Sequence, residues 1–262
     1  MGYNDSLSGL ASVQKAFALL DVVAAHNRGM AAKEIAAELS MPLPTVYRLL
    51  KTLVVSGHLV HLRNEGLYGL GYKLHALDNS LRRQVGTPPS VSKLVRELHV
   101  RADAAAYYAV HRGEDIVVAH VVDSPTRPRI TPMGFGFNDG AHATAFGKVL
   151  LAAMDADHCR AYLEQHGMPG MTAATIMDPA AFETELGKVR SSGIAIEREE
   201  FIRGASCMAA PVTTAGGQTV GSVAVSMDPA EFQNRRGEVS VLLRDVASRV
   251  SRALRGTPLL GS

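Results

Sequence analysis

The stretch that decides the fold is residues 33–60, KEIAAELSMPLPTVYRLLKTLVVSGHLV. Its apolar residues follow helical spacing in two runs, a short one over 32–39 and a longer one over 46–54. Residues 40–42, SMP, interrupt the pattern, and Pro44 suits the first turn of a helix, where its missing N–H removes no hydrogen bond. Two helices joined by a turn of about four residues predict a helix-turn-helix.

The residues on either side of this stretch complete a larger unit. Upstream, residues 12–27 carry apolar side chains at the spacing of a helix with one buried face. Downstream, the period changes to that of two short strands, 58–63 and 67–70, around the turn NEG at 64–66. A helix, a helix-turn-helix and a hairpin in this order predict a winged helix-turn-helix, which we assign to residues 1–71.

A linker helix and a second domain are expected after the hairpin. Residues 72–85 return to helical spacing before GTPP breaks the helix, so we assign the linker to 72–89 and the second domain to 90–262. Strands that pair as hairpins, before and after a group of helices, predict an α+β fold on an antiparallel sheet. The expected helices are 91–98, 143–154, 157–165, 179–191 and 239–250, and the expected strands are 104–111, 116–123, 129–135, one near 194, 207–213 and 219–226.

The outward side chains of the second helix in the motif suit the major groove of DNA. Arg48 is the best candidate for reading a guanine, because its planar fork matches two acceptors on the base edge, whereas Lys51 suits phosphate. We expect double-stranded operator DNA as a partner. The candidate contacts are Gln14 and Lys15 in the first helix, Leu43, Thr45, Tyr47, Arg48 and Lys51 in the recognition helix, and Arg63 in the wing.

Two other interpretations of the N-terminal unit stay open at this point. The unit can be a packing or dimerisation module, in which Arg48 and Lys51 are solvated surface charges. It can also be the docking surface of a ligand sensor that acts through protein partners alone. The Pro-Thr start of the helix and its outward Tyr, Arg and Lys side chains favour DNA.

Composition narrows the remaining classes of protein. The chain carries 27 Lys and Arg against 25 Asp and Glu, and its first 86 residues hold nine and six of these, so the weak positive excess lies in the N-terminal third. Cys159 and Cys207 lack CxxC spacing, which argues against a disulfide framework and a thiolate metal site. The sequence shows no run of about 18 apolar residues and no secretory leader, so we expect a cytoplasmic protein that does not contact a membrane. We also expect no metal and no cofactor.

From about residue 12 to 254 the sequence resembles the IclR family of bacterial transcriptional regulators. The N-terminal segments SVQKAFALLDVVA, KEIAAELSMPLPTVYRLLKTLVVSGHLV and LYGLGYKL resemble the family's winged helix-turn-helix and the start of its linker. HATAFGKVLLA at 142–152 and GIAIEREEFIRGASCMAAPV at 193–212 resemble the family's C-terminal signatures. Their common order and separation make the resemblance specific.

The resemblance implies a C-terminal effector-binding domain of GAF- or profilin-like fold, and self-assembly as dimers or tetramers on palindromic or repeated operators. Effectors in the family are usually small carboxylates or aromatic metabolites of catabolic pathways. Members that bind small oxo-acids tend to have aspartate in place of Glu197, serine in place of Ala224 and a small residue in place of Phe146, which leaves the ligand open. When the family's pocket positions are matched to this sequence, the resemblance implies that the pocket contacts are Ala145, Phe146, Glu197, Cys207, Ala224 and Ser226.

Elementary chemistry agrees in part with these positions. Backbone amides where His142 and Thr144 lead into a helix, together with the hydroxyl of Ser226, suit a carboxylate ligand. Glu197 repels an anion unless it is protonated or paired. For His142 we favour a core residue that orders the loop over a ligand donor.

The remaining candidates have an ordinary packing alternative. Met133 and Phe135, which alternate with Phe137, suit an apolar wall of the pocket, but we favour strand packing for at least two of the three. Cys207 is more typical of a small buried strand residue than of a reactive thiol. The acidic cluster at 197–200 is most simply a solvated turn with one member facing the pocket.

An enzyme is the main rival class of protein. Cys207, His142 and Glu197 have the residue types of a nucleophile, a base and an orienting acid. No catalytic sequence context surrounds Cys207, and no glycine-rich phosphate loop is present. We therefore expect a DNA-binding regulator rather than an enzyme, with activation or repression left open.

Overall fold

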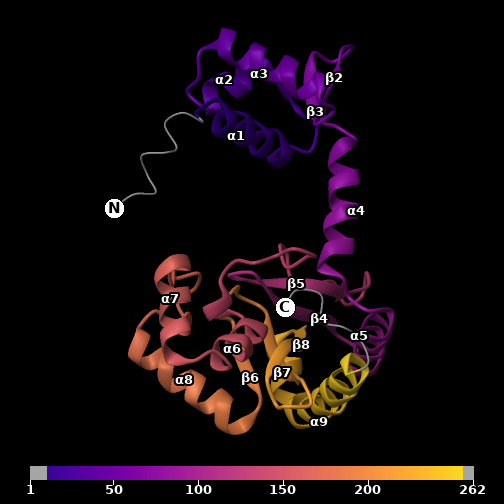
Figure 1. Ribbon diagram of the computed structural model, residues 1–262, viewed down its shortest axis with the longest axis vertical. Helices are drawn as coiled ribbons and strands as arrows, with labels where there is room; N and C mark the ends of the chain where they lie inside the picture. The colour runs from indigo at the N-terminus through magenta and orange to yellow at the C-terminus, as the bar shows by residue number, and fades with distance from the viewer. Residues whose placement is uncertain (1–10, 256–262) are drawn as a thin grey trace. The chain divides into compact units, whose positions relative to one another are not determined.

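The computed structural model describes residues 11–255, which divide into two compact units between Gln84 and Val85 (Figure 1). In the first unit, α1 (Ala11–Ala25), α2 (Ala32–Glu38) and α3 (Leu43–Val55) pack around one core, and α4 (Lys73–Val85) ends at the division. Each of the three packed helices contributes a fully buried side chain, namely Leu19, Ile35 and Leu50. Their positions confirm the predicted helical spacing.

A three-stranded sheet completes the first unit. The predicted hairpin is confirmed as β2 (Leu59–Leu62) and β3 (Leu67–Leu70), but a third strand, β1 (Met30–Ala31), pairs with β3 as well. Sequence periodicity missed β1 because two residues are too few to show an alternation. Gly29 precedes β1 with a φ of +78°, and a Cβ there would lie 2.5 Å from the carbonyl oxygen of Tyr68, so only glycine fits.

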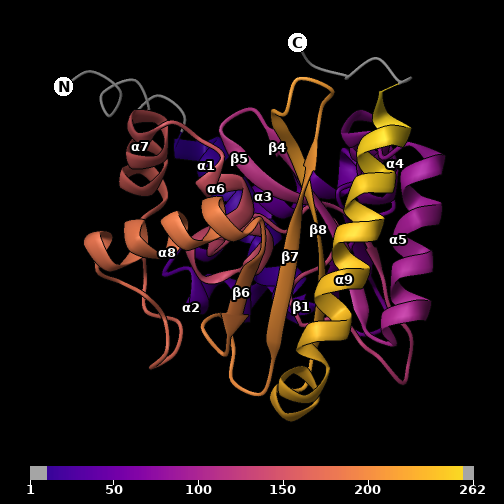
Figure 2. The same ribbon diagram turned by 90° about the horizontal axis from the view of Figure 1, so that it is seen from below.

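The second unit is built on one antiparallel sheet with strand order β5-β4-β8-β7-β6. The strands are β4 (Ala105–Arg112), β5 (Asp115–Val122), β6 (Ala195–Arg198), β7 (Ser206–Thr213) and β8 (Thr219–Met227). One face is covered by α5 (Pro89–Ala102) and α9 (Pro229–Leu254), and the other by η2 (Ala141–Ala143), α6 (Ala145–Ala152), α7 (Ala156–His166) and α8 (Pro179–Ser192) (Figure 2). This architecture confirms the predicted α+β fold.

Each face of the five-stranded sheet carries its own hydrophobic core. Along β7, Met208 and Ala210 belong to the core under α9, whereas Cys207 and Ala209 belong to the core under α6. Because both faces are buried, the strand is apolar throughout and does not alternate with polar residues. The predicted effector residues gather on the α6 side.

The predicted strand 129–135 is wrong, because this segment is a loop. The backbone amides of Arg129 and Ile130 donate to side chains, to Asp123 Oδ2 at 3.3 Å and to the hydroxyl of Tyr107 at 2.9 Å. Amides that are satisfied by side chains do not form a ladder with a neighbouring strand. The amides of Met133 and Gly134 donate to carbonyls within the loop, so the segment adds no strand to the sheet.

Within residues 11–255, no helix combines the length and the apolar character that crossing a bilayer requires.

Candidate functional site

The α3 helix exposes a polar face that follows directly from its periodicity. Leu49 and Leu50 point into the core, whereas Arg48 and Lys51 are exposed and the side chain of Tyr47 is 49 % exposed. The hydrophobic face buries the helix against α1 and α2, which leaves the opposite face free for a partner. This face brings the three central DNA-contact candidates together.

The other DNA-contact candidates of α3 are less accessible. Thr45 is half-buried, and the half-buried Leu43 packs against the core. In addition, the exposed Thr52 was missed by sequence reasoning, and its hydroxyl donates to the carbonyl of Arg48 at 3.1 Å. The sequence signal that could have identified Thr52 is its position one helical turn after Arg48.

The wing and the first helix present further exposed candidates. Arg63 is exposed in the turn at 63–66, and Gln14 and Lys15 are exposed on α1. Next to the turn, the exposed His61 stacks on Tyr68 with ring centroids 4.5 Å apart. Sequence reasoning missed His61 because the stack depends on the register between β2 and β3.

In the second unit, three strands place polar side chains in one row, which we call the Glu197 row. Glu197 on β6 pairs with Cys207 on β7, and Cys207 pairs with Ser226 on β8. The hydroxyl of Tyr107 lies 3.1 Å from the hydroxyl of Ser226 and accepts a hydrogen bond from the amide of Ile130. Sequence reasoning missed Tyr107, because only the strand register shows that it meets Ser226.

Burial controls the charge of Glu197. Desolvation raises its pKa to about 7, against the opposing effect of hydrogen bonds from the Cys207 thiol and from the backbone amides of Glu200 and Phe201. Near neutral pH the side chain is therefore present in both its neutral and its charged form. The neutral form does not repel an anion. A protonated Glu197 is therefore compatible with a carboxylate ligand.

The HATAFGK segment is packed beside this row. His142 is buried, its Nε2 donates to the carbonyl oxygen of Pro169 at 3.1 Å, and burial lowers its pKa. Thr144 caps α6 by accepting from the amide of Gly147 at 3.2 Å. The geometry gives His142 a clear packing role, in which it joins the segment to the loop before α8.

The apolar candidates fill the space over the sheet. Met133, Ala145, Phe146 and Ala224 are buried in the core under α6, and Phe135 is half-buried. The buried Phe137 meets Phe146 edge to face with ring centroids 6.5 Å apart. A separate cleft of about 220 Å³ is lined by Arg127, Arg129, Ile130, Gly204 and Ser226, among others. Of the predicted effector residues, Ser226 alone lines this cleft.

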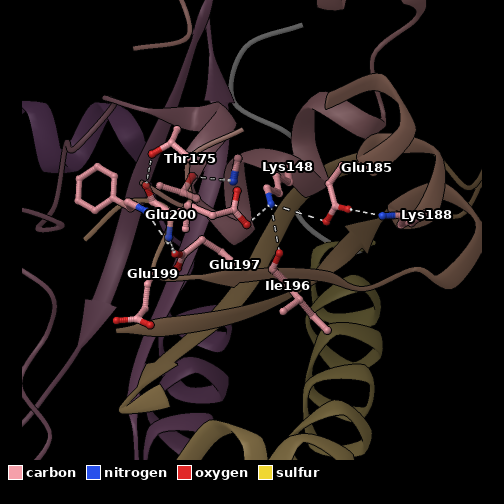
Figure 3. Close-up of polar contacts among 12 residues, drawn as sticks. Lys148, Thr175, Glu185, Lys188, Ile196, Glu197, Glu199 and Glu200 are labelled. Atoms are coloured by element: carbon pink, nitrogen blue, oxygen red, sulfur yellow. Dashed lines mark hydrogen bonds and ion pairs between the residues drawn. The ribbon is translucent and has the colours of Figure 1, made fainter. Parts of the chain in front are cut away.

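Sequence reasoning missed a buried ion pair between Lys148 and Glu200 (Figure 3). Lys148 on α6 is fully buried, and its ammonium donates to Glu200 Oε1 at 2.6 Å and to the carbonyl oxygen of Ile196 at 3.2 Å. Glu185 Oε1 on α8 lies 3.6 Å from the same nitrogen. A single lysine in an apolar helix gives no sign of which carboxylates will reach it. Figure 3 shows them converging from two segments.

The geometry disfavours a cysteine nucleophile. Burial, and then the neighbouring Glu197, raises the pKa of the Cys207 thiol well above its usual value. A nucleophilic cysteine reacts as the thiolate, which this environment opposes. Among the described residues, no group of three or more His, Cys, Asp or Glu side chains is placed to hold a metal ion.

Comparison with known proteins identifies both units. The family model "Bacterial transcriptional regulator IclR C-terminal" matches residues 88–252, and "IclR helix-turn-helix domain" matches residues 12–63. The chain is 32% identical over 254 residues to the HTH-type transcriptional regulator Rv1719 of Mycobacterium tuberculosis, covering 95% of this chain and 94% of the relative.

Solved structures share the fold. The IclR protein of Thermotoga maritima matches with a TM-score of 0.77 and 23% identity, covering 94% of this chain and 99% of that one. An IclR homolog from Microbacterium hydrocarbonoxydans, solved in complex with 4-hydroxybenzoate, matches with a TM-score of 0.75 and 18% identity, covering 94% and 100%. With both family models and a curated relative in agreement, the chain belongs to the IclR family of bacterial transcriptional regulators.

Proposed function

We propose that this regulator binds a specific operator through α3 and that a small organic effector, held in the second unit, controls the binding. The exposed face of Tyr47, Arg48 and Lys51, on a helix whose other face is buried, carries the proposal. Arg48 reads a base edge and Lys51 meets phosphate. Gln14, Lys15, Thr45 and Arg63 position the domain on the duplex.

The proposed effector is a small carboxylate or aromatic metabolite of a catabolic pathway. It enters by the cleft at Ser226 and reaches the Glu197 row, where Ser226 and neutral Glu197 supply hydrogen bonds. Phe146 and Met133 supply apolar contacts. The Microbacterium relative, which was solved with 4-hydroxybenzoate, supports this ligand class.

We further propose roles for the three parts of the chain. Residues 1–71 bind DNA, residues 72–89 transmit the effector signal, and residues 90–262 bind effector and assemble the protein as a dimer or tetramer. An effector shifts the population of the DNA-binding form only if its affinity differs between the two forms. The family relation supports a regulator without enzymatic activity, because the named relative is a transcriptional regulator.

Selection of genome fragments tests the proposal. The purified full-length protein is immobilised, and fragments of its own genome compete with excess random DNA at moderate salt. We expect enrichment of a discrete site with repeated half-sites, whose neighbouring genes nominate the effector. If no site enriches, the selection is repeated with a panel of small carboxylates and aromatic acids, 4-hydroxybenzoate among them. Failure to enrich a site under all of these conditions contradicts operator recognition.

Salt dependence separates operator binding from docking on a protein partner. Binding through several phosphates releases counterions and weakens steeply between low and moderate salt. Docking between largely apolar surfaces lacks this slope.

A further inference from the structure

The α4 helix adds nothing to the core of the first unit. Within residues 11–255 no side chain of α4 is buried, and none belongs to the hydrophobic core that α1, α2 and α3 share. The helix has 13 residues, and a helix of this length without packing partners is marginal in water. A stable α4 therefore needs a partner.

Three leucines follow one face of α4, and we call Leu74, Leu77 and Leu81 the leucine stripe. Their separations of three and four residues are those of positions a, d and a in a heptad repeat. Leu77 is 49% exposed, and Leu74 and Leu81 are half-buried. The opposite face carries polar residues, among them Asn79 and Arg82. A narrow apolar stripe on a polar helix is the seam of a coiled coil.

Charges beside the leucine stripe select the direction of a partner helix. Lys73 stands at position g of the heptad and Asp78 at position e. In a parallel pair of identical helices, position g of one helix faces position e of the next heptad on the other, so Lys73 meets Asp78 of the second copy. The two-fold axis repeats this contact on both sides of the seam.

Both charged groups are accessible for this contact. Lys73 is exposed, and its ammonium forms no ion pair within residues 11–255. Asp78 pairs with Arg82 of its own helix at 2.8 Å, yet its side chain stays 43% exposed. The stripe and its flanking charges are therefore complementary to a second copy of the same helix.

We propose that α4 pairs with α4 of a second copy of this chain in a parallel, two-stranded coiled coil. The leucine stripe of each helix packs against the stripe of the other. The pairing relates two α3 helices by a two-fold axis, which suits binding to two half-sites. This interface is distinct from the assembly that we propose for residues 90–262.

Disulfide cross-linking of the full-length protein tests the pairing. Leu77→Cys and Leu81→Cys each place a thiol in the seam, whereas the control Ala76→Cys places one on an exposed position of the same helix. We expect both seam variants to form disulfide-linked dimers under mild oxidation at least about fivefold faster than the control, because only seam positions bring two identical residues within bonding distance. The native Cys159 and Cys207 are buried, so the wild type gives the background.

A charge swap tests the parallel register in the Leu77→Cys background. Lys73→Glu puts like charges opposite each other and is expected to slow cross-linking by about twofold or more. Adding Asp78→Lys restores opposite charges across the seam and is expected to recover the original rate. The recovery depends on a contact between two copies, because the swap does not rebuild the pair between Asp78 and Arg82.

Two results overturn the proposal. The first is that Leu77→Cys and Leu81→Cys cross-link no faster than Ala76→Cys, which assigns the stripe to another partner or to the second unit of the same chain. The second is an unchanged rate in Lys73→Glu, or no recovery on adding Asp78→Lys, which excludes the parallel register. Cross-linking is measured without DNA or effector, so its outcome is independent of operator recognition.

Discussion

The thiol of Cys207 donates a hydrogen bond to the carboxylate of Glu197, its direct partner across β6 and β7. Both groups are buried, so burial raises the pKa of each. With a pKa of about 7, Glu197 is the member of the pair that changes charge near neutral pH. The chemistry available to an effector at this row therefore depends on pH.

The first prediction concerns stability against pH. Because the pKa of Glu197 is raised in the folded state, the folded protein holds a proton that the unfolded chain has released. Its contribution to the free energy of unfolding is therefore lost as the pH rises from about 4.5 to about 7, and is constant above that. Glu197→Gln removes this loss, so the variant gains roughly 3 kcal/mol relative to wild type across the window.

Urea unfolding of wild type and Glu197→Gln at several pH values measures this gain. Glu114→Gln, which changes an exposed carboxylate in the turn between β4 and β5, is the matched control. The stability difference between Glu197→Gln and wild type should change between about pH 4.5 and about pH 7. A difference that stays constant over this range contradicts the raised pKa of Glu197.

The second prediction separates base reading from phosphate contact on α3. Arg48→Ala is expected to weaken binding to the selected operator by about 1–3 kcal/mol and to relax discrimination at one base pair. Lys51→Ala weakens operator and random DNA alike and reduces the salt slope by about one. Fluorescence anisotropy over a salt series measures both effects. Unchanged operator affinity in Arg48→Ala shows that the recognition residue is assigned wrongly.

The third prediction concerns the hydroxyl of Tyr107. Tyr107→Phe leaves the amide of Ile130 and the hydroxyl of Ser226 without this partner, so we expect a loss of about 1–2 kcal/mol in the free energy of unfolding. Tyr108→Phe is the matched control, because that buried tyrosine lies in the core under α9. Equal effects of the two substitutions in urea unfolding argue against the Tyr107 contacts.

The fourth prediction compares two helical glycines. A Cβ on Gly147 of α6 would lie 2.1 Å from the carbonyl oxygen of Ala141, so Gly147→Ala is expected to destabilise the second unit by more than about 3 kcal/mol. A Cβ on Gly187 of α8 would meet nothing within 4 Å. Gly187→Ala is therefore expected to stabilise the protein by about 0.5–1 kcal/mol. Thermal unfolding of both variants measures these changes in stability. If Gly147→Ala leaves the stability unchanged, the close approach of Gly147 to Ala141 is contradicted.

Local sequence signals predicted most of the elements that position the candidate sites. Apolar residues recur every 3.6 positions in a helix and every two positions in a strand, and turn residues mark the ends of both. These signals depend only on neighbouring positions, so the helices α1 to α3 and the β2–β3 hairpin were predictable. The error at 129–135 has the opposite origin. Its apolar alternation is real, but the side chains of Asp123 and Tyr107 bind its amides, and no local pattern reveals those partners.

The sequence by itself determined the order of the helices α1 to α9, the exposed face of α3 and the family to which the chain belongs, because these depend on spacing along the chain. Only the tertiary structure decided that Glu197, Cys207 and Ser226 share a row, since strand register sets which residues face each other. It also decided that Lys148 is buried. A buried ammonium is tolerated only when acceptors converge on it, and Ile196 and Glu200 do so from 48 and 52 residues away in the chain.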